Sequence, residues 1–224
     1  MSLNRKHILF LAFLFTPGII FSQTRISAST NFIILRSFKK DQRFWAIGQD
    51  VFVDWHFTNK GGAYASLSYS SNGNFTNQLS ANAKDSATSP QQISFTNKAQ
   101  MRVQQISLGF KHYFVGTIDA EDKWNLYSTT GFGLMFGRVS NSYSTTIDTS
   151  LYYAPQNPVN GRGHFKRLTL DLGLTWEVPL SADFYFYVTG KVWIPTSDYP
   201  SKYLFVNDSA PLIGSAGLGI RTLF

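Results

Sequence analysis

Cysteine is absent from the 224-residue sequence, which excludes disulfide bonds, thiolate metal sites, cysteine nucleophiles and a lipid anchor on an N-terminal cysteine. Charged residues are also scarce, at 15%, where soluble domains have about 25%. Aromatic residues, by contrast, make up 16% of the chain, with 20 Phe and 11 Tyr. Many rings are therefore available to face something other than water.

The formal net charge is +7, from 20 basic and 13 acidic residues. Without Arg5 and Lys6, which lie in the N-terminal segment, 18 basic residues remain against 13 acidic ones, a charge of +5. No cluster of Lys and Arg is interleaved with stacking aromatic residues, so we expect no nucleic-acid partner. We interpret the excess as an effect on solubility or on contact with anionic lipids.

The N-terminus has the three parts of a secretory signal. Two basic residues come first, an apolar run over 8–21 follows, and the small Ser22 precedes Gln23. As a membrane anchor the run is shorter than the roughly 20 residues that a spanning helix needs, and a proline and a glycine interrupt it. We predict a cleaved signal peptide over 1–22 and one mature domain over 23–224.

From Gln23 onward the apolar residues recur with period two, and turn residues bound each run. The segment 164–178 is the clearest, because every second residue from Leu168 to Val178 is apolar while polar or small residues alternate with them. No helix is predicted in the mature chain. We expect strands at 24–36, 45–57, 62–72, 100–115, 123–138, 164–178, 183–195 and 211–224.

Three observations favour a membrane over a soluble core. The expected strands run to about 11 to 16 residues, which suits a bilayer crossing of about 9 to 11. Glycines on the polar faces fit a narrow barrel interior that needs small residues. Short connections also alternate with long polar ones, as in outer-membrane barrels. The long, extracellular ones are 37–44, 73–99, 139–163 and 196–210, and the short, periplasmic ones are 58–61, 116–122 and 179–182.

The sequence therefore predicts an all-β fold: a single antiparallel up-and-down transmembrane β-barrel of about eight strands, after an N-terminal signal peptide. A soluble sandwich or lipocalin-like barrel is the competing fold. Aromatic residues gather near the periplasmic strand ends, where they would form an interfacial girdle. The girdle candidates are Trp55, Phe57, Phe114, Trp124, Trp176 and Phe184, with the C-terminal Phe224.

The last strand carries a resemblance to a known family. With Gly219 two places before Arg221, and Phe224 at the end, the chain resembles small bacterial outer-membrane β-barrel proteins of the porin-like superfamily. The resemblance implies an integral outer-membrane location, contact with membrane lipids and lipopolysaccharide, and recognition of the last strand by the outer-membrane assembly machinery. Thr222 departs from the pattern, which usually has an apolar residue there. The serine-glutamine junction and the loops look like barrels of Bacteroidetes-type bacteria.

Charged residues on the predicted inward faces form a candidate interior network. They are Arg25, Asp50, Asp54, Lys111, Arg167, Asp171, Glu177, Lys191 and Arg221. If the turn 179–182 pairs Val178 with Phe184, Asp171 lies directly opposite Lys191, within reach of an ion pair. Because an unpaired interior charge is costly, we favour a salt-bridged plug over the alternative, a narrow ion path.

Signals for other chemistry are weak. His164 is the one histidine predicted near extracellular loops with Ser, Asp and Tyr, and no His-x-Ser element accompanies it. The histidines are dispersed and no acidic loop repeats a ligand spacing, so no metal or cofactor site is predicted. The candidates for contact with an extracellular or envelope protein are the loop 73–99 and the aromatic Tyr199, Tyr203 and Phe205.

Three functions follow in order of preference. The first is a non-enzymatic integral outer-membrane barrel whose loops serve interaction or envelope integrity. A small porin-like channel is the second. An outer-leaflet enzyme that modifies lipid A is the third.

Overall fold

The structure is a computed structural model that describes residues 25–153, 155, 157–196 and 210–224. These residues form one antiparallel sheet of nine strands. Among them, no helix is long and apolar enough to cross a membrane. The strands are β1 (Arg25–Ser37), β2 (Trp45–Thr58), β3 (Gly61–Ser70), β4 (Gly73–Asn82), β5 (Gln92–Val115), β6 (Asn125–Tyr143), β7 (Gly161–Ser181), β8 (Phe184–Pro195) and β9 (Ile213–Leu223).

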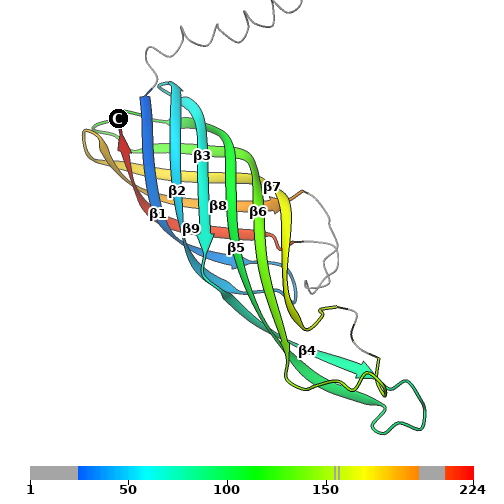
Figure 1. Cartoon of the computed structure of the whole chain (residues 1–224). Coiled ribbons are helices and arrows are strands. Elements are labelled where there is room, and N and C mark those ends of the chain that lie inside the picture. Colours follow the sequence, from blue (N-terminus) through cyan, green and yellow to red (C-terminus); the bar gives the residue numbers. More distant parts are fainter. Residues whose placement is uncertain (1–24, 154, 156, 197–209) are drawn as a thin grey trace, which may run out of the picture.

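Eight of these strands close into a ring (Figure 1). β1 pairs with both β2 and β9, and each later barrel strand pairs with its neighbour in the chain. The exception is β3, which passes over β4 and pairs with β5 from Gly61↔His112 to Tyr69↔Gln104. This pairing closes the barrel, so the predicted up-and-down barrel of about eight strands is confirmed.

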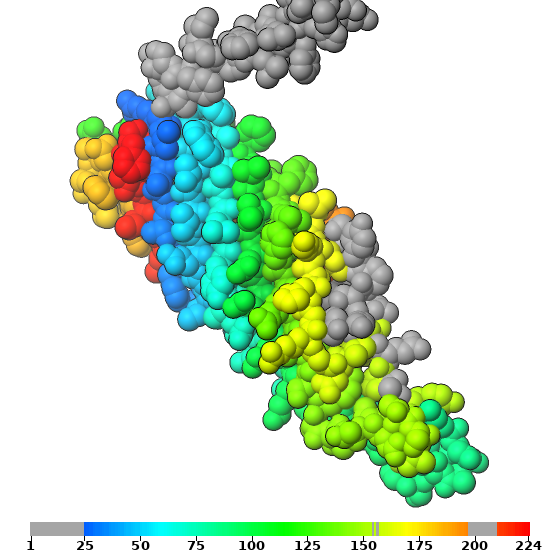
Figure 2. Space-filling model, viewed as in Figure 1, coloured from blue at the N-terminus to red at the C-terminus, as the bar shows by residue number. Residues whose placement is uncertain are grey.

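The ninth strand corrects one prediction. The segment 73–99, expected as a loop, contains β4 and the first part of β5, which pair from Gly73↔Met101 to Asn82↔Gln92. β6 likewise runs on to Tyr143, into the expected loop 139–163. Together they form an extension that projects beyond the barrel, at the end opposite the C-terminus (Figures 1 and 2). Outside a bilayer both faces of a hairpin tolerate polar residues, so the alternation is too weak there to predict strands.

The extension has a small hydrophobic core of its own. Ala81, Phe95 and Tyr152 are buried in it, and the Tyr143 ring packs against Phe95 at a tilt, with ring centroids 5.0 Å apart. The Lys84 backbone nitrogen donates to the Leu151 oxygen, and the Tyr153 backbone nitrogen donates to the Asn82 oxygen. These bonds tie the loop after β6 to the end of β4. The extension is thus a folded element rather than an open loop.

The barrel wall has the predicted division of faces. Apolar side chains such as Leu168, Leu172 and Leu174 point outward and are exposed, whereas the residues between them point inward. The interior itself has two halves. The half toward the C-terminus is polar, but the half toward the extension holds an apolar cluster: Ile33, Leu35, Phe44, Ala46, Phe75, Ala99, Met101, Val103, Met135, Val139, Phe165, Trp193, Ala210 and Ile213.

This apolar half was not predicted. In β1 the residues from Phe32 to Leu35 are apolar on both faces, so period two cannot separate the lipid side from the core side. Phe32 is exposed and Ile33 is fully buried. Only the pairing of the strands decides which residue of each pair faces inward.

Glycines allow the wall to accept a large side chain from a neighbouring strand, because Tyr64 of β3 pairs with Gly109. Gly109 of β5 lies directly opposite Gly131 of β6. A Cβ atom at position 131 would meet the Tyr64 hydroxyl oxygen at 2.7 Å and the Gly109 Cα at 2.8 Å. Tyr64 is buried against this smooth surface. A side chain at either position would therefore displace the tyrosine.

We expect Gly131→Val to lower the free energy of unfolding by about 1–3 kcal/mol, because it overpacks the interior against Tyr64. Gly190→Val is the matched control, since its Cβ would have no neighbour within 4 Å. Denaturant unfolding in detergent micelles measures both variants. Equal stability of the two variants would contradict the described packing.

Candidate functional site

The barrel interior contains eight of the nine charged residues predicted to face it. Arg25 is the exception: its side chain is 49% exposed at the rim, where it pairs with Asp119 at 2.6 Å. It lies at the first position of β1, beyond the end of the pairing with β9, which begins at Ser27↔Leu223. Arg167 is buried beside the apolar cluster, with its guanidinium over the Phe165 ring at 5.6 Å.

Three ion pairs neutralise six of the interior charges. Lys111 Nζ lies 2.9 Å from Asp54 Oδ2, and Lys191 Nζ lies 2.5 Å from Asp50 Oδ2. The second pair joins β8 to β2, which are not neighbours in the sheet, so it spans the barrel. Arg221 binds Glu177 through two parallel bonds of 2.7 and 2.8 Å: Nε donates to Oε2 and Nη2 to Oε1. In this narrow interior each charge meets its partner in place of water.

The predicted pair between Asp171 and Lys191 is wrong. Asp171 lies opposite Trp193, because Val178 pairs with Phe186, two places beyond the residue assumed. The expected turn 179–182 is too long: β7 runs on to Ser181, which pairs with Phe184, so only 182–183 connect the strands. A bulge between Pro179 and Ser181 then shifts the register back by one place, and counting residues across the turn could find neither feature.

Asp171 is stabilised by neutral donors instead. Gln105 Nε2 and Thr169 Oγ1 each donate to Asp171 Oδ1 at 2.7 Å. The Ser107 hydroxyl donates to the other carboxylate oxygen. The donors come from β5 and β7, two strands separated by β6.

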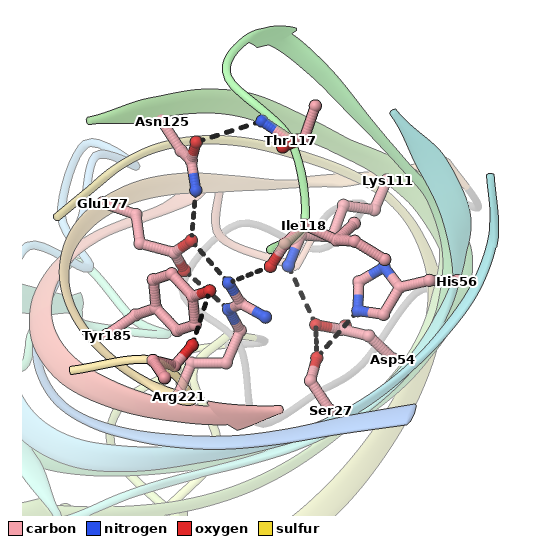
Figure 3. Close-up of polar contacts among 11 residues, drawn as sticks. Ser27, Asp54, His56, Lys111, Thr117, Ile118, Asn125, Glu177, Tyr185 and Arg221 are labelled. Carbon is pink, nitrogen blue, oxygen red and sulfur yellow. Dashed lines mark hydrogen bonds and ion pairs between the residues drawn. The ribbon is translucent and has the colours of Figure 1, made fainter. Parts of the chain in front are cut away.

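The turn between β5 and β6 folds into the mouth of the barrel at the end of the C-terminus and closes it (Figure 3). Ile118 in this turn is 2% exposed and packs on Tyr113 and Tyr127. Its backbone oxygen accepts a hydrogen bond from Arg221 Nη2 at 3.0 Å. Its backbone nitrogen donates to the Asn59 oxygen at 3.1 Å, which ties the turn to the one between β2 and β3.

Asn125 connects this turn to the buried ion pair. Its Oδ1 accepts from the Thr117 backbone nitrogen at 3.2 Å, and its Nδ2 donates to Glu177 Oε1 at 2.9 Å (Figure 3). On the outer side of the turn Asp119 binds Arg25. Partial burial raises the pKa of Asp119, but hydrogen bonds from Thr117 and Arg25 outweigh this effect and hold the pKa below its ordinary value.

The interior also brings together a serine, a histidine and an aspartate that sequence reasoning did not connect. Ser27 Oγ donates to Asp54 Oδ2 at 3.1 Å and lies 2.9 Å from His56 Nε2 (Figure 3). The order differs from that of a hydrolytic triad, in which the acid orients the histidine from its other nitrogen. All three side chains are buried, with Ser27 at 0% exposed, so a substrate has no approach. The group belongs to the packing of the interior.

The space left between these groups is small. A cavity of about 20 Å³ lies beside Asp54, Lys111 and Lys191. A water molecule needs about 10–15 Å³ of such space. The cavity therefore has room for about one water and does not form a continuous path.

The remaining predicted residues lie on the outside or beyond the described residues. The six girdle candidates are exposed on the outer surface near the end that holds the C-terminal Phe224. Phe224 is 74% exposed, and its backbone nitrogen donates to Ile26 at 2.8 Å. Gly219 faces inward, close to Asn31. The signal segment 1–22 and the contact candidates Tyr199, Tyr203 and Phe205 lie outside the described residues.

No family model and no curated protein matches the chain. Among solved structures it is similar to Ail, the attachment invasion locus protein of Yersinia pestis, in complex with the heparin analogue sucrose octasulfate (TM-score 0.49, 11% identity, 90% of this chain and 99% of that one). It is also similar to the N-terminal β-barrel domain of OprF of Pseudomonas aeruginosa (0.49, 11%, 90% and 100%). The outer membrane protein OprG of the same organism is a third (0.48, 10%, 89% and 95%). These neighbours are small outer-membrane β-barrel proteins.

We expect Arg221→Met to lower the free energy of unfolding by about 3–5 kcal/mol, because Glu177 would keep a buried charge without its partner. Arg25→Met removes an ion pair at the exposed rim and should cost at most about 1 kcal/mol. Thermal or urea unfolding in micelles compares the two. A loss no larger for Arg221 than for Arg25 would contradict the stabilising role of the buried pair.

Proposed function

We propose that the chain is an integral outer-membrane protein without enzymatic activity, exported by a cleaved signal over 1–22. Its domain, 23–224, forms a sealed barrel that holds the extension of β4, β5 and β6 outside the cell. The extension serves contact with a partner or envelope integrity. The single observation that carries this proposal is a closed barrel with an apolar outside and a filled, ion-paired inside.

The outer surface fits a bilayer in chemistry and height. On β7 the outward residues are Trp176 and then four leucines, ending at Leu168, of which Leu170 is half-buried. The next outward residue is Lys166. Trp176 and Lys166 are ten positions apart, which is roughly 33 Å along a strand and about 25 Å at a tilt of about 40°. This is the height of the apolar band of such barrels. In water, so large an apolar surface would cause aggregation.

The filled interior favours a scaffold over a channel. Ile118 blocks one mouth, the ion pairs of Asp50, Asp54 and Glu177 cross the polar half, and the apolar cluster occupies the other half. A barrel of about eight strands has an interior just wide enough for its own side chains. The charged lining was the reason to consider a porin-like channel. Most of its charges form ion pairs that connect the strands of the wall.

The extension supports a role in contact. Its core keeps it folded, and Leu151 and Tyr153 near its tip are exposed, at 47% and 61%. A rigid apolar tip contacts a partner at a lower entropy cost than a flexible loop. Tyr199, Tyr203 and Phe205 are contact candidates from the sequence alone. At the other side, the exposed Phe224 fits recognition by the assembly machinery.

We expect the purified protein, inserted into planar lipid bilayers, to give no steady conductance, because its interior is filled. Large steady pores would overturn the sealed barrel and favour the channel. Heat-modifiable gel migration of the same sample serves as the control that the barrel is folded.

We expect an epitope inserted between Ser86 and Ala87, at the tip of the extension, to bind antibody on intact cells. An epitope inserted between Glu121 and Asp122, in the turn at the other mouth, should bind only after the outer membrane is opened. Fluorescence of labelled cells measures both. The reverse pattern would invert the orientation. Recovery of the tagged proteins in the soluble fraction alone, with no labelling of cells, would contradict the membrane location.

A further inference from the structure

The outward faces of the described strands carry lysine and arginine but no aspartate or glutamate. The four acidic residues within these strands, Asp50, Asp54, Asp171 and Glu177, all face inward. Apart from Arg25, which pairs with Asp119 at the opposite rim, every lysine or arginine that points outward lies toward the end of its strand that is extracellular in the proposed orientation. These residues are Arg36, Lys98, Arg102, Arg138, Arg162 and Lys166.

Four of the six cations lie together on β5, β6 and β7. Arg138 of β6 is directly opposite Arg102 on one side and His164 on the other. Arg162 and Lys166 flank His164 two places away along β7, so each is a diagonal neighbour of Arg138. Directly opposed residues have Cβ atoms about 5 Å apart, and diagonal ones about 7–8 Å. Arg138 is therefore the centre of a cationic cluster.

This arrangement costs stability unless an anion is present. Like charges directly opposite each other on a sheet repel. Among the described residues, none of the four cations forms an ion pair with a carboxylate. Arg102 donates to the Tyr69 hydroxyl at 3.1 Å, a neutral acceptor that does not reduce the charge.

The cluster lies at a defined height on the barrel. Leu168 and Phe136 belong to the apolar band, and the next outward residues along their strands are Lys166 and Arg138. In the proposed orientation this is the edge of the outer leaflet, where lipid phosphate groups lie. Guanidinium forks match phosphate oxygens in a bidentate manner, and Lys166 adds a point charge.

We propose that Arg102, Arg138, Arg162 and Lys166 form a binding site for the phosphate groups of an outer-leaflet lipid. The apolar surface below them, including Phe136 and Leu168, contacts the acyl chains of the same molecule. The site rests on the proposed membrane location. Its position at the edge of the apolar band favours a lipid over a soluble polyanion, which would meet cations higher on the extension.

The test measures lipid binding to the folded protein in zwitterionic micelles by native mass spectrometry. The probes are bisphosphorylated lipid A and the same lipid after enzymatic removal of its phosphates. We expect Arg138→Gln to weaken binding of the phosphorylated probe by about tenfold, the effect of losing a charge-assisted hydrogen-bonding group. Arg36→Gln removes the same charge from β1, where the partners are Trp45 and Gly214, and should change binding less than twofold.

A second readout keeps the test independent of folding. Without lipid, Arg138→Gln should melt at the same or a higher temperature, because a repulsion is removed. The phosphorylated probe should then raise the melting temperature of the wild type more than that of the variant. Equal binding by wild type and Arg138→Gln, or equal binding of both probes, would overturn the site while leaving the proposed barrel intact. The lipid site would also be overturned if Arg138→Gln weakened the binding of sucrose octasulfate but not the binding of lipid A. Failure of the wild type to fold in micelles would overturn both.

Discussion

The pairing of β3 with β5 is the interaction on which the rest of the structure depends. In a bilayer every backbone donor and acceptor of a spanning strand must be satisfied by a neighbour, so an open edge is not tolerated. By passing over β4, β3 removes the last free edge of the ring and fixes which residue of each alternating pair faces inward. The same pairing leaves β4 and the first part of β5 outside the barrel wall. Closure thus creates both the barrel and the extension.

A closed ring of eight strands leaves little interior space, and this explains the chemistry inside. Charges that cannot reach water must find partners across the barrel, as Lys191 does with Asp50 and Arg221 with Glu177. The turn that carries Ile118 enters because Arg221 and Asn125 offer its backbone hydrogen bonds. The outer surface has the opposite composition. In the part of the chain that the structure describes, acidic residues lie only in the interior and in turns and loops, so the outer wall meets its surroundings with apolar groups and a cationic edge.

Much of the fold could be predicted from the sequence, because alternation over long segments such as 164–178 is a strong signal of a two-sided strand. Relations between strands could not. β7 runs on to Ser181 and turns within two residues, which places Asp171 opposite Trp193 rather than Lys191, and no local pattern marks this turn or the bulge beside it. The group of Ser27, Asp54 and His56, and the row of Arg102, Arg138 and His164, join residues far apart in the chain. Only the register of the ring places them together, whereas the extension was missed because its strands lack a lipid-facing side.

Hydrogen exchange of backbone amides in lipid nanodiscs tests the central claim, the closure of the ring, most directly. The account predicts that amides of β3 from Ala63 to Tyr69, and of β5 from Gln104 to Phe110, exchange as slowly as those in the middle of β1. It also predicts faster exchange in β4, which pairs on one side only. Fast exchange along β3 and this part of β5 together, as at an open sheet edge, would contradict it.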